Sequence, residues 1–221
     1  MWNQLIGVNN SAEIWNPETG RWHQGALGDR ARLYHSTALL LPDASVLVAG
    51  GGAPGPQNNL NAEIYYPPYL FTGSGERAAR PTITSAPGYL EIGKTFTIDT
   101  GNAASIDRVV MVRNGSVTHG FNMDQRFLDL SFNRSGSQLV AQAPTHAGEA
   151  PPGYYMLFVL DAAGVPSVAK MVRIGIAADP DPSSVPTLTN PGPQSGQAGS
   201  PTTLALSASD PNGDRLTFSA S

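Results

Sequence analysis

The stretch RLYHSTALLLPD, residues 32–43, places a tyrosine and a histidine side by side at the start of an apolar run. The apolar residues 37–41 predict a β-strand, and the sequence Pro-Asp-Ala-Ser at 42–45 predicts a turn after it. Residues 46–49, VLVA, predict a second, buried strand that runs into Gly50-Gly51-Gly52. Glycines at that place suit an exit where neighbouring backbones crowd together. The chain around Tyr34 and His35 is therefore predicted to be β-structure.

The composition of the 221-residue chain favours many turns over long helices. It holds 24 glycines and 19 prolines, while charged residues make up 14%. Hydrophobic residues, at 40%, are sufficient to bury a core. The net charge of −4 and the pI near 5.5 indicate no basic face, so we expect no nucleic-acid partner.

The absence of cysteine excludes disulfides, thiolate nucleophiles and cysteine metal ligands within this chain. No stretch approaches 18 apolar residues, so no membrane span is expected. The first residues also lack the charged and apolar regions of a signal peptide. A secreted protein shows this pattern when its beginning is missing.

An internal repeat points to a propeller. The sequence AEIWNP at 12–17 returns as AEIYYP at 62–67, an offset of 50 residues. A period near 50 is typical of kelch repeats, in which each repeat forms one four-stranded propeller blade. Residues 1–70 are therefore predicted to hold the last blades of a kelch-type β-propeller, one blade nearly whole and the other only a tail. Two blades cannot close a ring, so the chain is interpreted as a fragment.

Three further segments follow the repeat. Short alternating apolar runs between 80 and 175, separated by Gly, Asn, Asp and Pro turns, predict an immunoglobulin-like β-sandwich of about seven strands. Residues 176–193 are rich in Pro and Ser and predict an extended linker. Residues 194–221 predict the start of a truncated immunoglobulin-like or cadherin-like module. The predicted fold class is all-β throughout.

Several motifs, in this order along roughly residues 10–175, closely resemble the C-terminal part of the galactose oxidase and glyoxal oxidase family of copper radical oxidases. They are RLYHS at 32–36 with the turn at 42–43, the three glycines at 50–52, THGFNMDQR at 118–126, and PGYYMLFV at 152–159 with GVPS at 164–167. The resemblance implies a propeller end followed by an early set domain at 80–175.

The resemblance also implies a copper site. It assigns Tyr34 as the axial tyrosine, the base for the proton of the substrate hydroxyl, and His35 and His119 as the two histidine ligands. In the family a second tyrosine, joined to a cysteine by a thioether, completes the site. This chain has no cysteine, so we expect that half of the site to be absent from it.

Without the resemblance, the same residues have plainer interpretations. Neighbouring residues in a regular strand point to opposite faces, so Tyr34 and His35 can share one metal only at a strand end or bend. His23 and His146 are interpreted as surface histidines, and Asp124, Gln125 and Arg126 as residues that brace the loop around His119. Asp210 and Asp214 could bind Ca²⁺, but an Asn-Gly hairpin turn explains their spacing equally well.

The first functional hypothesis is that the parent protein is a copper radical oxidase. It would oxidise primary alcohols, aldehydes or sugars with O2 and release H2O2, as a secreted or cell-surface monomer. We expect the fragment itself to be inactive. The alternative hypothesis is a secreted or surface protein that reuses the kelch and sandwich scaffold for carbohydrate binding or adhesion, and whether this chain acts as an enzyme stays open at this point.

Overall fold

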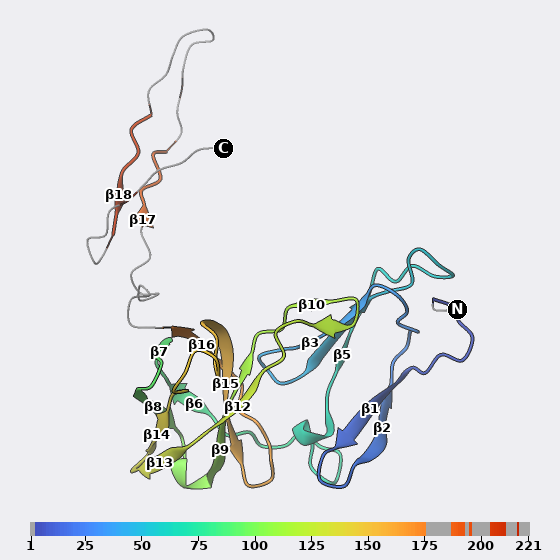
Figure 1. The fold of residues 1–221 in the computed structure, drawn as a ribbon, viewed down its shortest axis with the longest axis horizontal. Coiled ribbons are helices and arrows are strands. Elements are labelled where there is room, and N and C mark those ends of the chain that lie inside the picture. Colours follow the sequence, from blue (N-terminus) through green and yellow to red (C-terminus); the bar gives the residue numbers. More distant parts are fainter. Residues whose placement is uncertain (1–2, 176–186, 193–194, 196–203, 211–215, 217–221) are drawn as a thin grey trace. The chain divides into compact units, whose positions relative to one another are not determined.

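The computed structural model describes residues 3–175, 187–192, 195, 204–210 and 216. The described chain is all-β, as predicted, with two single-turn 3-10 helices, η1 (Pro68–Leu70) and η2 (Ala103–Ser105) (Figure 1). It divides into two compact units, Met1–Ile176 and Ala177–Ser221. Among the described residues there is no helix with the length and apolar character needed to cross a membrane.

A β-sandwich of two sheets forms the second half of the first unit. The five-stranded sheet has the order β12 (Phe127–Leu130), β9 (Ile106–Arg113), β15 (Gly153–Asp161), β16 (Lys170–Gly175) and β7 (Tyr89–Glu91). The four-stranded sheet has the order β13 (Phe132–Ser135), β14 (Gln138–Gln142), β8 (Thr95–Thr100) and β6 (Ile83–Ser85). All neighbours are antiparallel except β16 and β7. Nine strands thus replace the seven or so expected, because β7, β12 and β13 are short strands without a long apolar run.

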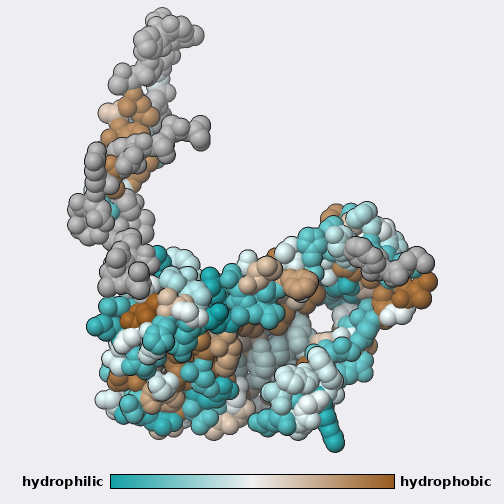
Figure 2. All heavy atoms as spheres, viewed as in Figure 1, coloured by the Kyte–Doolittle hydropathy of each residue, from teal (hydrophilic) through white to brown (hydrophobic). Residues whose placement is uncertain are grey.

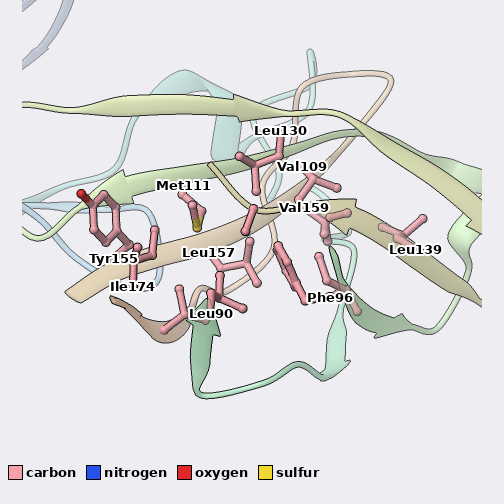
Figure 3. Packing of buried hydrophobic residues seen from close by; sticks show 14 of the residues in the cluster. Leu90, Phe96, Val109, Met111, Leu130, Leu139, Tyr155, Leu157, Val159 and Ile174 are labelled. Carbon is pink, nitrogen blue, oxygen red and sulfur yellow. The ribbon is translucent and has the colours of Figure 1, made fainter. Parts of the chain in front are cut away.

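The main core lies between these two sheets. Alternate residues of β9 and β15 point into it, among them Val109, Met111, Leu157 and Val159 (Figure 3). Leu139 of β14 closes the core from the four-stranded sheet. This alternation is the period of two that the sequence pattern of a sandwich requires.

The five-stranded sheet also buries its other face. Val110, Met156 and Phe158, the residues between those of the main core, pack with Ala44 and Leu70 into a second hydrophobic cluster. Because both faces of β9 and β15 are covered, their sequences are continuous apolar runs instead of alternating ones. The second cluster joins the sandwich to the segment that precedes it.

That preceding segment contains a hairpin and a three-stranded sheet. The hairpin consists of β1 (Ser11–Asn16) and β2 (Arg21–Leu27), and the sheet has the order β3 (Ser36–Leu40), β4 (Val46–Gly50) and β5 (Ala62–Tyr65). The turn expected at 42–45 is present, with the Ala44 N–H donating to Leu41 O at 2.8 Å. The two repeats detected at an offset of 50 residues correspond to β1 and β5.

Arg80 ties the β3–β4 turn to the sandwich. Its guanidinium donates to the backbone carbonyls of Asp43 (2.8 Å), Pro166 (2.7 Å) and Ser167 (2.6 Å). The Ala169 N–H donates to Pro42 O at 2.8 Å beside it. A planar guanidinium presents several donors in one rigid fork, which suits a bridge between two backbone segments.

The second unit is described only in part. It contains β17 (Thr187–Leu188) paired antiparallel with β18 (Ala208–Ser209). β17 lies inside the segment that was expected to be an extended linker, so strand pairing begins earlier in the chain than expected. Asp214 of the suggested Ca²⁺ site lies outside the described residues.

Hydrophobic side chains reach the surface of the first unit as well as its core, and Figure 2 shows brown, hydrophobic atoms among the hydrophilic ones on the visible face. On the hairpin β1–β2, Trp15, Trp22 and Leu27 are exposed. Leu60, just before β5, is 92% exposed. Single exposed apolar residues are common in soluble proteins. Here, however, the large apolar side chains of one small hairpin are exposed together, so the β1–β2 hairpin buries little hydrophobic surface.

Candidate metal centre

Tyr34 and His35 lie in a turn directly before β3. The Ser36 N–H donates to Leu33 O at 3.1 Å, and His35 has a left-handed backbone with φ of 67°. This turn breaks the strand alternation that would send the two side chains to opposite faces. Their ring centroids therefore lie 3.8 Å apart. The bend that shared metal binding requires is present.

The glycines at the end of β4 make room for this turn. Gly51 and Gly52 have φ of 99° and 101°, where only glycine is unstrained. A Cβ at Gly51 would lie 3.1 Å from the backbone N and O of Leu33. The Gly52 N–H donates to Tyr34 O at 2.7 Å. The backbone is crowded at the end of β4, as the sequence predicted for these glycines. The neighbouring segment that approaches it contains Leu33 and Tyr34 and so includes a candidate ligand.

A partly buried arginine fixes the start of the same loop. The Arg32 side chain, 10% exposed, pairs with Glu63 of β5 at 2.5 Å and donates to Gly50 O at 3.2 Å. The Glu63 carboxylate also accepts the Asp29 N–H, and this bond together with Arg32 lowers the pKa of Glu63. Asn59 Nδ2 donates to Ala31 O at 2.9 Å. The loop is therefore anchored on β4 and β5 before it reaches Tyr34.

His119 occupies the tip of a small hairpin that projects from the sandwich. β10 (Val117–Thr118) and β11 (Phe121–Asn122) are joined by His119 and Gly120, whose φ angles are 52° and 79°. Two left-handed central residues are the signature of a type I′ turn, the turn whose twist matches a two-residue hairpin. The turn thus presents His119 at the most extended point of its loop.

Side chains at the base of this hairpin hold it in place. Asn122 Oδ1 accepts the N–H groups of Ser116 (3.0 Å) and Asp124 (3.1 Å). Asp124 pairs with Arg113 of β9 at 3.4 Å. Arg126 Nη1 donates to Gly148 O at 2.9 Å. The expected bracing role of Asp124 and Arg126 agrees with these contacts.

The hairpin packs against β3 and so meets the other two candidates. A Cβ added to Gly115, before β10, would lie 2.7 Å from Leu39 Cδ1 of β3, so the Leu39 side chain would have to move to accept any larger residue there. The His119 ring centroid lies 4.5 Å from that of His35 and 5.4 Å from that of Tyr34. Residues 84 positions apart in sequence are thereby brought into one cluster of three rings at the surface.

Both histidines use the same ring nitrogen for a protein contact. His35 Nδ1 lies 2.7 Å from Ala53 O, and His119 Nδ1 lies 2.7 Å from Thr118 Oγ1. In metal sites, the second ring nitrogen of a histidine ligand is oriented by such a partner. Nε2 of each ring would then bind the metal.

The donor types fit a copper ion. Imidazole nitrogen suits copper, and the phenol oxygen of Tyr34 would add a third donor. No group of three or more His, Asp or Glu side chains is placed to hold a metal among the residues that the structure describes. A metal here would therefore depend on the tyrosine as well as on the two imidazoles.

The structure brings together the three residues singled out from the sequence, and leaves His23 and His146 exposed at the surface. Sequence reasoning missed Ala53 and Thr118, which contact the histidines, and Arg32 and Asn122, which anchor the two loops. A backbone carbonyl such as that of Ala53 has no sequence signal. The position of Thr118 next to His119 was the only available hint.

The chain is similar to known proteins over most of its length. The family described as "Galactose oxidase-like, Early set domain" matches residues 80–174. Galactose oxidase of Gibberella zeae is 40% identical over 166 residues, which cover 73% of this chain and 24% of that protein. An aldehyde oxidase, GLOX, of Vitis pseudoreticulata is 33% identical over 163 residues, which cover 66% of this chain and 31% of that protein. The chain thus spans about a quarter to a third of the length of these relatives.

A solved structure agrees with the sequence comparison. A fungal alcohol oxidase of the AA5 family, in complex with copper, superposes with a TM-score of 0.71 at 34% identity, over 76% of this chain and 36% of that chain. Both the all-β fold and the family resemblance are thereby confirmed. Residues 80–174 of this chain form an early set domain of the galactose oxidase-like family.

Proposed function

We propose that this chain is part of a copper radical oxidase, in which Tyr34, His35 and His119 are three of the copper ligands. The observation that carries the proposal is the meeting of the His35 and His119 rings, 4.5 Å apart, from two loops with separate anchors. Two loops with independent hydrogen bonds have no structural need to bring two imidazoles and a phenol together. The substrates would be primary alcohols, aldehydes or sugars.

The proposed roles follow from the donor atoms. Copper would supply a one-electron redox centre and polarise the substrate hydroxyl. Tyr34 Oη would accept the hydroxyl proton, and the 36% exposure of this residue leaves it within reach of a small substrate. Oxidation of the alcohol to the aldehyde releases two electrons and two protons, which reduce O2 to H2O2. The second one-electron acceptor, a tyrosine joined to a cysteine in the family, cannot form within a chain that has no cysteine.

Copper(II) binding by the 221-residue chain tests the proposal. We expect His119→Ala to weaken binding by at least about tenfold, whereas His146→Ala, a change at an exposed histidine of the sandwich, leaves it unchanged. The isolated chain should form no H2O2 from alcohols or aldehydes in the presence of O2. Equal copper affinity in His119→Ala and the unsubstituted chain would contradict the assigned ligand set, and H2O2 formation would contradict the expected inactivity.

The remaining parts of the architecture are proposals of the same kind. The hairpin β1–β2 and the sheet β3–β4–β5 would be the last blades of a kelch propeller, within residues 1–70. Residues 194–221 would begin an immunoglobulin-like or cadherin-like module. The parent would be a secreted or cell-surface monomer, since such modules are common outside the cell.

A binding role is the second candidate, and one observation favours it. A cavity of about 670 Å³ lies between the hairpin and the sheet, lined by apolar residues such as Val46, Val48 and Ile64 and by Arg32 and Glu63. Neither Tyr34 nor the two candidate histidine ligands line it. Binding of a carbohydrate by the chain, together with copper affinity that is insensitive to His119→Ala, would favour this role over the oxidase.

A further inference from the structure

The two candidate histidine ligands are held by different kinds of partner. His35 Nδ1 faces a backbone carbonyl, Ala53 O, at 2.7 Å. A carbonyl can only accept, so His35 must carry its hydrogen on Nδ1 and its Nε2 lone pair is available. His119 Nδ1 faces the Thr118 hydroxyl at 2.7 Å. A hydroxyl can donate or accept, so this contact alone is compatible with either tautomer.

We propose that Thr118 is a positioning residue for the metal centre: its hydroxyl accepts the Nδ1 hydrogen of His119 and leaves Nε2 as the metal-binding nitrogen. The inference rests on the proposed function, because it assigns a role within the copper site proposed above. With the opposite polarity, Thr118 donates to Nδ1, and Nε2 carries the hydrogen and cannot bind. Metal binding therefore selects the arrangement in which Thr118 is the acceptor.

The hairpin makes Thr118 suitable for this role. Thr118 is the last residue of β10 and pairs with Phe121 across the type I′ turn, so its backbone is fixed on both sides of His119. Its branched side chain has few rotamers, which keeps the hydroxyl at the ring. Because the partner is the adjacent residue, the contact forms within the hairpin and does not depend on docking against β3.

The two ligands are consequently unequal. A backbone carbonyl, Ala53 O, fixes the tautomer of His35, whereas a side chain that mutation can change, that of Thr118, orients the His119 ring. Loss of such an orienting partner typically lowers metal affinity by about 10- to 100-fold. Substitution of Thr118 can therefore change affinity for the metal without removing a ligand.

Thr118→Val tests the proposal, because valine keeps the branched shape and the β-propensity of threonine but removes the hydroxyl. In the full 221-residue chain we expect copper(II) affinity, measured by competition with a chelator of known affinity, to fall about 10-fold or more. Thr118→Ser should restore most of it. The copper EPR spectrum should change in the valine variant and return in the serine variant. Thr97→Val, an exposed threonine of β8 in the sandwich, is the matched control and should change neither.

The outcomes separate this inference from the proposed function. If the unsubstituted chain binds copper and Thr118→Val binds it with equal affinity and an equal spectrum, the positioning role is wrong and the ligand set stands. If Thr118→Ser binds as weakly as the valine variant, the hydroxyl is not the active feature, and the role is again wrong. If copper affinity is unaffected by both His119→Ala and Thr118→Val, His119 is not a copper ligand. The proposed function is then wrong, and the positioning role of Thr118, which depends on it, is wrong as well.

Discussion

At the scale of single residues, both candidate histidine ligands have left-handed backbones, with φ of 67° at His35 and 52° at His119. This conformation costs an L-residue roughly 1–2 kcal/mol, and histidine, asparagine and aspartate adopt it more often than other residues except glycine. Backbone strain of this kind tends to be kept where a functional side chain has to be placed. The placement of the proposed ligands would therefore cost some local stability.

His119→Asn should reveal this cost. Asn-Gly is the preferred pair for a type I′ turn, so the variant is expected to unfold at a slightly higher urea concentration. Its copper affinity should fall, since the imidazole is lost. His146→Asn, at an exposed histidine of a sandwich loop, serves as the control. A loss of stability in His119→Asn would show that the ring contacts with Tyr34 and His35 outweigh the strain of the turn.

A second residue-scale prediction concerns pH. Burial raises the pKa of Asp43, but the Ser45 side-chain and backbone hydrogen bonds and the charge of Arg80 outweigh it and lower the pKa below 3.8. A lowered folded-state pKa stabilises the fold above the unfolded-state value, and this contribution is lost as the pH falls through the folded-state value. Asp43→Asn should therefore lower the free energy of unfolding at pH 7 by up to about 1 kcal/mol, and the difference should shrink below about pH 4.

Urea titrations of the unsubstituted chain and the Asp43→Asn variant at pH 7, 5, 4 and 3 would measure this difference. In a Ser45→Ala background the pH-dependent part should decrease, because the Ser45 hydroxyl donates to the carboxylate at 2.5 Å. A difference in unfolding free energy between the two proteins that stays constant from pH 7 to pH 3 would rule out the charge as its cause.

At the scale of elements, the apolar runs at β4, β9, β14 and β15 were predictable because their side chains alternate or stay hydrophobic over four or more residues. β7 and β13 were not predictable, since each exists only through pairing with a neighbour in its sheet. For the site, the sequence pattern alone favoured an ordinary Tyr and His. Only the family resemblance joined His119 to them, because the docking of β10 on β3 is a contact between distant segments that no periodicity reveals.

This docking predicts a compensating pair of substitutions. Gly115→Val should push the β10–β11 hairpin away from Leu39 and so separate His119 from His35, which would lower copper affinity about tenfold or more. Leu39→Ala removes the methyl group that lies 2.7 Å from the position of the added Cβ. The double variant should recover part of the affinity, by a measurable coupling between the two positions. Strictly independent effects of the two changes on copper binding would contradict the docking.

At the scale of the whole first unit, the sequence separated residues 1–70 from 80–175, whereas the structure joins them through a shared cluster. The pattern showed that β9 and β15 are apolar on both faces, but it did not show what covers the second face. That cover comes from Ala44, Leu70 and their neighbours. Sandwich and preceding sheet should therefore unfold together, with Arg80 as a polar clamp at the same contact.

This shared cluster predicts that three polar substitutions improve the solubility of the isolated sandwich but destabilise the 221-residue chain. Residues 80–176 alone would expose Val110, Met156 and Phe158, each 3% exposed in the whole chain, and burial of such side chains contributes about 1.5–3 kcal/mol each. The isolated sandwich should therefore bind a hydrophobic dye and self-associate. Polar replacements, Val110→Thr, Met156→Gln and Phe158→Gln, should reduce both effects there, yet lower the free energy of unfolding of the 221-residue chain by several kcal/mol. Sedimentation measures self-association of the isolated sandwich, and urea denaturation measures the free energy of unfolding of the whole chain.

If the isolated sandwich is monomeric and does not bind the dye, or if the replacements leave the whole chain as stable as before, the second cluster does not couple the sandwich to the preceding sheet.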